Sequence, residues 1–165
     1  MRPHTVILVA AALVFSASLS SRLLAAPGPQ TAAQDAQAAA ADAAGRAMVE
    51  QVCTLCHDAT LIEGGNRTPA EWDDVLERMA ANGASASQEQ AEQIRAYLLR
   101  NFGRVNVNRA PARDLASVLN VEAPVADAVV MYRTERGGFT TIEDLKKVPG
   151  IDGAKIEARK TRLMF

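Results

Sequence analysis

The chain has 165 residues, with 19 acidic and 18 basic side chains, two cysteines and seven aromatic residues. This length allows one or two small domains. The balanced charge excludes a polybasic nucleic-acid tail and an acidic disordered chain, and two cysteines are too few for a disulfide-rich scaffold. Because apolar residues make up 48% of the chain but few are aromatic, we expect something other than aromatic packing to fill part of the interior.

Residues 1–26 have the pattern of a secretory signal peptide. Arg2 supplies a short positive region, residues 5–15 are apolar and uncharged, and small residues precede a cleavage site after Ala26, with Ser20 as an earlier alternative. A retained membrane anchor is the competing interpretation, but the apolar run is shorter than the roughly 18–20 residues of a spanning helix. We therefore expect export to the periplasm, with no transmembrane segment after cleavage.

The next segment, residues 27–43, consists almost entirely of Ala, Gln, Pro, Gly and Asp, which predicts a linker. Beyond the signal peptide the charge is uneven. Residues 27–103 carry 11 acids and 5 bases, net −6, whereas residues 104–165 carry 8 acids and 11 bases, net +3. This asymmetry predicts two modules with different partners, residues 44–103 and residues 104–165.

The first module contains the run Cys53-Thr54-Leu55-Cys56-His57, which has the C-x-x-C-H attachment pattern of c-type haem. Two thiols at this spacing on a helical turn can reach the vinyl groups along one porphyrin edge, and the adjacent histidine then faces the iron. A redox-active cysteine pair and a structural disulfide are the alternatives, although the strand pattern expected around a thioredoxin-like pair is not visible. The sequence predicts one covalently attached haem c per chain.

Three helices are predicted around this motif. The first covers residues 44–56, where apolar side chains recur on one face. The second and third begin at capping boxes and end at glycines. These signals are Thr68 with Glu71 and Gly83 for the second helix, and Ser87 with Gln90 and Gly103 for the third.

Together these features resemble a small class I-like c-type cytochrome. The resemblance implies three helices around the haem, with His57 as the proximal iron ligand and Met79 as the distal one. An ordinary core methionine is the alternative for Met79, and the iron would then be open to other ligands. The residues that carry the resemblance are the C-x-x-C-H run, Arg67-Thr68, Glu71-Trp72, Met79, Gly83, Tyr97-Leu98 and Phe102-Gly103.

Three further side chains are candidates for contact with the haem. Trp72 and Tyr97 each offer a ring to the haem edge and a polar atom to a propionate, and Arg67 offers a positive charge to a propionate. Core packing for the two rings and a solvated surface position for the arginine are the alternatives. The acidic residues that follow Thr68 are either a solvated helix face or a surface that steers a basic redox partner.

Residues 104–165 resemble the helix-hairpin-helix domain of ComEA-type competence proteins, which bind DNA outside the cytoplasm. Four helices are predicted, ending at Leu119, covering 125–134, capped by Thr141 and beginning at Gly153. The complete prediction is thus an all-α chain, a three-helix cytochrome module followed by a four-helix module. The resemblance rests on 105–110, Leu115, Ala126, Val129, 132–133, 138–141, 144–145, 148–151 and 155–157.

Each hairpin of that family is a Gly-hydrophobe-Gly turn whose backbone amides approach a DNA phosphate. The resemblance therefore implies phosphate contacts at Gly150, Gly153 and Lys155. The first hairpin, residues 120–122, reads Asn-Val-Glu and lacks both glycines, and the second has Asp152 in place of its second glycine. These acids predict poor DNA binding and favour a protein-docking role.

The sequence therefore predicts an exported electron carrier that is not an enzyme and has no catalytic residues. Its redox partners would be a dehydrogenase donor and a cytochrome or oxidase acceptor, with the second module as the docking element. The alternative is a DNA-binding helix-hairpin-helix protein in which the haem senses redox state or tethers the protein.

Overall fold

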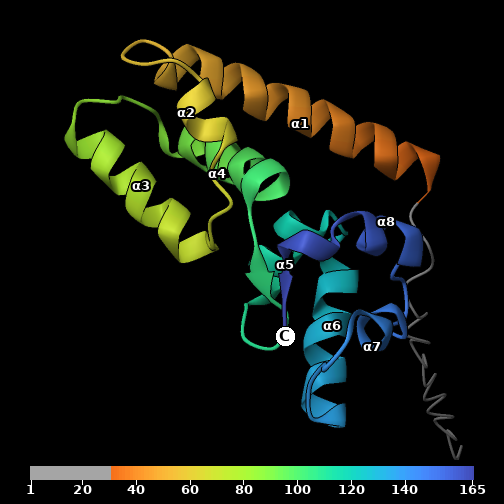
Figure 1. Ribbon diagram of the computed structural model, residues 1–165. Coiled ribbons are helices and arrows are strands. Elements are labelled where there is room, and N and C mark those ends of the chain that lie inside the picture. The colour runs from red at the N-terminus through yellow and green to blue at the C-terminus, as the bar shows by residue number, and fades with distance from the viewer. Residues whose placement is uncertain (1–30) are drawn as a thin grey trace, which may run out of the picture.

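The computed structural model describes residues 31–165, so the predicted signal peptide lies outside the described residues. The described part is mainly helical, which confirms the helical fold class, and has one short pair of parallel strands (Figure 1). Its elements are α1 (Ala32–Cys53), α2 (Thr60–Glu63), α3 (Pro69–Ala81), α4 (Gln88–Phe102), β1 (Val105–Asn106), α5 (Ala112–Leu119), α6 (Ala123–Arg136), α7 (Ile142–Lys146), α8 (Gly153–Ala158) and β2 (Leu163–Met164).

The segment predicted as a linker, residues 27–43, is helical from Ala32 onward. Alanine is the strongest helix former, and Thr31 and Gln34 close a capping box at the N-terminus of α1. Asp42 is held by Arg100 and Asn101, which lie far along the chain. The composition of the segment gives no sign of these long-range contacts, so a structureless linker is the wrong description from Ala32 onward.

Helix α1 packs along α4 and continues towards α8 (Figure 1). The two helices approach closely at Gly45, because a Cβ atom there would lie only 2.5 Å from the Cβ of Tyr97. One turn further on, Val49 is buried at 4% exposure. A glycine at the crossing point therefore fixes where α1 lies on α4.

The capping boxes predicted at Thr68 and Ser87 are confirmed at the starts of α3 and α4. The loop before α3 is tied to the end of α4 by a parallel bridge between Arg67 and Gly103. Helix α2, a single turn, is an element that the sequence did not predict. These ties bring α3 against α4 on the side away from α1 (Figure 1).

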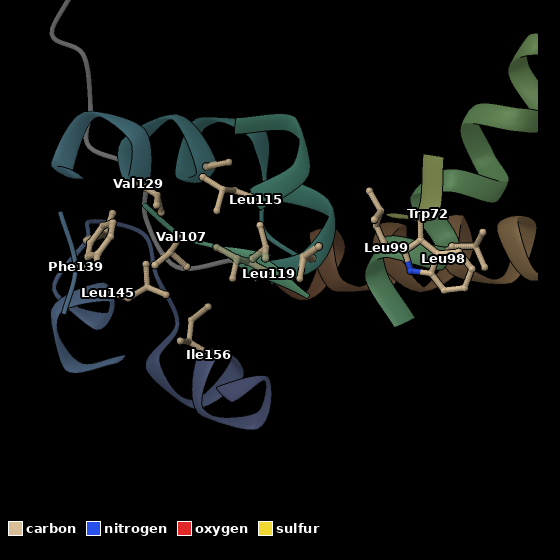
Figure 2. Close-up of a cluster of buried hydrophobic side chains, with 14 of the residues drawn as sticks. Trp72, Leu98, Leu99, Val107, Leu115, Leu119, Val129, Phe139, Leu145 and Ile156 are labelled. Carbon is tan, nitrogen blue, oxygen red and sulfur yellow. The ribbon is translucent and has the colours of Figure 1, made fainter. Parts of the chain in front are cut away.

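The four helices predicted in the C-terminal part are confirmed as α5 to α8. The turn between α5 and α6 is made by Asn120, whose φ of 55° places a non-glycine residue in the left-handed region. The side chain of Asn108 holds the loop after α6 by bonding both the N–H and the C=O of Phe139, at 2.7 and 2.8 Å. Figure 2 shows Phe139 with Val129, Val107 and Leu145 in the core of this part.

The two halves of the molecule are in direct contact. Arg95 of α4 bonds Asp73 of α3 at 2.6 Å and the buried Asp114 of α5 at 3.0 Å. Strand β1 follows α4 in the sequence and pairs with β2, which lies near the C-terminus. Within residues 31–165 no single helix is both long and apolar enough to cross a bilayer, and α5 with α6 satisfies the criterion only as a pair bent by 119°.

Candidate functional site

A cavity of about 550 Å³ lies between the end of α1, α2, α3 and α4. Its walls are mostly apolar, supplied by side chains such as Val52, Val75, Leu76 and Ile94. Binding sites for small molecules and cofactors have this size and apolar character. It brings together all but one of the residues predicted to contact a cofactor: Cys53, Cys56, His57, Arg67, Trp72 and Met79.

The two cysteines stand where α1 ends. Cys53 is the last residue of the helix and is half-buried, whereas Cys56 is exposed in the turn that follows. Both thiols are free, so the alternative of a disulfide between them is not realised. Burial raises the pKa of the Cys53 thiol, which keeps it protonated at neutral pH.

His57 also lines the cavity, and its ring is held by a backbone contact. Its Nδ1 lies 3.2 Å from the carbonyl oxygen of Asp58, which can only accept, so this contact is a hydrogen bond in the tautomer that carries its proton on Nδ1. A histidine that binds a metal commonly donates its other ring N–H in this way. That tautomer leaves Nε2 as the nitrogen with a free lone pair.

The other predicted cofactor residues have different surroundings. Met79 is half-buried on the cavity wall. The indole N–H of Trp72 donates to the carbonyl of Phe102 at 3.3 Å, and Arg67 stacks over the Trp72 ring at 4.9 Å. Tyr97 is not at the cavity, because it packs at the α1–α4 crossing and edge-on against Phe102.

Within residues 31–165, no group of three or more His, Cys, Asp or Glu side chains is arranged to hold a metal ion. A closed site made of such protein ligands alone is therefore absent from this part of the chain. The candidate ligands at the cavity are instead one imidazole and one thioether.

The second hairpin, between α7 and α8, is a candidate phosphate site. Gly150 has a φ of 85°, as the tight turn requires. The carboxylate of Asp152, however, accepts the N–H groups of Ala154 at 2.9 Å and of Lys155 at 3.2 Å. The amides at the start of α8 are therefore occupied by a side chain of the same hairpin.

The first hairpin offers few amides to an anion. Glu122 is the N-cap of α6 and makes no side-chain capping bond. Pro124 has no N–H, and the N–H groups of Val125 and Ala126 both donate to the Glu122 carbonyl. Neither hairpin thus presents the open set of amides that a glycine-rich turn provides.

Several basic side chains of the C-terminal part make contacts within the fold. Arg159 donates to the carbonyls of Val118 and Arg100, and Arg162 donates to that of Arg100, so both cap helix C-termini. Burial, with the nearby Arg162 and Arg100 charges, lowers the pKa of Arg159 to about 10. Lys146 is paired with both Glu143 and Glu157.

The basic side chains that stay largely exposed are fewer. Lys147 and Lys160 flank the second hairpin, and their side chains are 62% and 63% exposed although each pairs with an acid. The sequence could not separate these lysines from the partly buried Arg159 and Arg162, because the distinction depends on which helix ends the side chains reach. The remaining exposed cations of this part are Arg109, Arg113 and Arg136.

Comparison with known proteins concerns the C-terminal part. The helix-hairpin-helix motif family matches residues 100–164. ComE operon protein 1 of Bacillus subtilis is 39% identical over 59 residues, which cover 36% of this chain and 29% of that protein. An uncharacterized protein of Haemophilus influenzae is 35% identical over 63 residues, covering 38% of this chain and 56% of the relative.

Human endonuclease/exonuclease/phosphatase family domain-containing protein 1 is 38% identical over 63 residues, covering 38% of this chain and 11% of that protein. The chain thus spans only part of each of these relatives. No solved structure matches it.

These findings correct the predicted function. The matched family and relatives give no sign of a cytochrome c segment, so the assignment as an electron carrier with dehydrogenase and oxidase partners is wrong. The helix-hairpin-helix assignment of the C-terminal part is confirmed. Residues 100–164 form a helix-hairpin-helix domain similar to that of ComE operon protein 1.

Proposed function

We propose that this protein binds DNA through its helix-hairpin-helix domain, outside the cytoplasm. The observation that carries the proposal is the match of this domain along both hairpins, together with its similarity to ComE operon protein 1. The ComEA-type proteins that the sequence resembles bind DNA in that setting. The predicted signal peptide, residues 1–26, supports export.

The contacts to DNA come from side chains rather than from hairpin amides. Asp152 already accepts the first amides of α8, and Pro124 removes a donor from α6. Lys147, at the end of α7, and Lys160, just after α8, both have largely exposed side chains. Lysines at these positions contact phosphates without reading bases, so binding is independent of sequence and strongly dependent on salt.

The test is a titration of the purified protein with fluorescent duplex DNA at about 50 and 200 mM salt. If about three phosphates are contacted, affinity should fall roughly 40-fold between the two conditions. The double variant Lys147→Glu, Lys160→Glu should lose most of this binding. Arg46→Glu, Arg78→Glu makes the same charge change on the other half of the molecule and should bind nearly as the wild type does. Absence of binding at 50 mM salt would contradict the proposal.

We further propose that the cavity would hold one haem, attached through Cys53 and Cys56, with His57 and Met79 as the side chains that would bind its iron. The volume, the apolar walls and the convergence of these four side chains support the fit. Each thiol would add across one vinyl double bond, forming a C–S bond while its hydrogen passes to the neighbouring carbon. When bound, haem supplies a one-electron centre, which suits a sensor of redox state or a tether for the DNA-binding domain.

The chain's own residues have separate tasks at this cavity. The Asp58 carbonyl orients His57, and the apolar side chains of α3 and α4 exclude water. Intact mass measurement after expression with the haem attachment machinery should show an added haem that survives denaturation. The Cys53→Ser, Cys56→Ser variant should lack it, and Met79→Ala should keep the haem but lose the low-spin six-coordinate spectrum. An unmodified mass for the wild type would contradict the attachment.

A further inference from the structure

The first half of α1 is unusual in what it buries. Between residues 32 and 43 no side chain is fully buried, and the three partly buried ones are Gln34, Ala38 and Asp42. Their spacing of four residues places them on one helix face. That face contains no large apolar side chain, so hydrophobic burial does not explain why this stretch lies against the rest of the molecule.

This face of α1 forms one wall of a groove of about 430 Å³. The opposite wall includes Asn120 of the first hairpin, together with Lys155 and Ala158 of α8, which follows the second hairpin. Figure 1 shows α1 extending past the end of α4 towards α8. The groove therefore brings α1 next to the two hairpin regions of the domain proposed to bind DNA.

Charged contacts hold the two walls together. The carboxylate of Asp35 pairs with the ammonium group of Lys155, the lysine that the resemblance places at a DNA phosphate. About two helical turns further along α1, Asp42 pairs with Arg100 at 3.1 Å and accepts from the amide of Asn101 at 2.7 Å. Two carboxylates thus stand on the face where a phosphate would approach.

These contacts are of a kind that a polyanion can replace. The side chains of Asp35 and Lys155 are 51% and 32% exposed, and pairs between exposed charges are weak and screened by salt. The remaining contacts of the segment come from small side chains such as Ala38 and Ala39. A DNA backbone presents many more negative charges than the two that it would displace.

We propose that residues 31–43 form an acidic strap that covers the hairpin face and competes with DNA for Lys155. The proposal rests on DNA binding by the helix-hairpin-helix domain. The strap lowers affinity in the closed arrangement and is displaced when DNA binds. Since α1 also ends at Cys53, the strap and the cavity share one continuous helix.

The experiment compares two charge-matched variants of the full protein in duplex DNA titrations at about 50 mM salt. Asp35→Asn, Asp42→Asn removes both strap carboxylates. Glu50→Gln, Glu92→Gln changes the net charge equally, at exposed acids that do not line the groove. The strap variant should bind about fivefold more tightly than the wild type, and the control should stay within about twofold.

A second variant, Ala40→Pro, tests the strap independently if the first variant does not fold. Proline in the helix interior breaks α1 within the strap, between Asp35 and Asp42, at an exposed position away from the core. It should also raise affinity, with the far-ultraviolet circular dichroism of the remaining helices retained.

The outcomes separate the two proposals. Equal binding by wild type, control and strap variants would overturn the strap while leaving DNA binding intact. A gain in the control as large as in the strap variant would show a general charge effect and would also overturn it. Absence of binding by every variant would overturn the DNA-binding function itself, and the strap with it.

Discussion

The two halves of the molecule fill their interiors in different ways. Residues 104–165 bury twelve hydrophobic side chains, whereas residues 44–103, a stretch of nearly equal length, bury five. The smaller set leaves a cavity of about 550 Å³ beside Trp72 and Leu98. In Figure 2, Trp72 lies with Leu98 and Leu99 apart from the larger group around Leu115 and Val129. The C-terminal half fills its interior with its own side chains, whereas the N-terminal half keeps a cavity with room for a bound group.

The halves also differ in how they use charge. The N-terminal half is acidic and pairs with the basic half through Asp35, which contacts Lys155, and Glu71, which contacts Arg104. In the C-terminal half, Arg159 and Arg162 cap helix ends, and several lysines pair with neighbouring acids. Net charge therefore overstates how much positive surface is open to DNA.

The largest expected effect contrasts the two interiors. Leu115 is fully buried in the C-terminal core, so Leu115→Ala should lower the free energy of unfolding by about 3 kcal/mol. Leu76 is only half-buried at the wall of an existing cavity, so Leu76→Ala should lower it by about 1 kcal/mol in the haem-free protein. Urea unfolding followed by circular dichroism measures both. Equal losses would mean that the two interiors are packed alike.

The next effect concerns the tie between the halves. Arg95→Ala leaves the buried carboxylate of Asp114 with only Arg113, at 3.7 Å, and should lower the free energy of unfolding by about 2 kcal/mol. Arg46→Ala removes an exposed pair on α1 and should change it by about 0.5 kcal/mol or less. The same urea titration reports both values. An Arg95 variant as stable as the Arg46 variant would contradict the claim that Arg95 links the two halves through Asp114.

A third effect depends on pH and belongs to the C-terminal half alone. A hydrogen bond from Lys147, with others from Thr140 and Thr141, holds the pKa of Asp144 well below its ordinary value. A lowered pKa contributes stability above the ordinary pKa of about 4, which is lost as pH falls through the folded-state value. The melting temperature of the wild type should therefore fall more steeply between pH 4 and 2 than that of Asp144→Asn. Parallel curves for the two proteins would contradict this assignment.

The smallest effect tests the altered hairpin. Asp152→Gly frees the amides of Ala154 and Lys155 and removes a negative charge, so affinity for duplex DNA should rise about threefold at low salt. Asp152→Asn removes the charge but retains an oxygen that can cap the helix, and should give a smaller gain. Weaker binding by the glycine variant would show that the hairpin capped by Asp152 itself contacts the DNA.

Local signals allowed much of the fold to be predicted from the sequence. The caps at Thr68, Ser87 and Thr141 are confirmed because a cap depends on residues three positions apart. The four C-terminal helices are confirmed because proline and glycine mark their boundaries. The start of α1 was not predicted because the residues that pair with its Asp42 and Asp35, Arg100 and Lys155, are distant in the sequence.

The candidate sites were predictable to different degrees. The C-x-x-C-H run and Met79 line one cavity. Tyr97 does not line it, because the Cβ of Tyr97 packs closely against Gly45 where α1 crosses α4. The electron-carrier assignment failed because an attachment motif indicates what is held, not what the whole chain does. It also gave too much weight to the hairpin acids, although exposed basic side chains such as Lys147 and Lys160 lie in the same domain.

Hydrogen–deuterium exchange of the full protein with and without duplex DNA tests the central claim most directly, because it locates the binding half. We predict slower exchange around the second hairpin, residues 146–160, and no change in α3. The strap, residues 31–43, should exchange faster once DNA is bound. Protection confined to α3 and the cavity, with none in the C-terminal half, would contradict DNA binding by the helix-hairpin-helix domain.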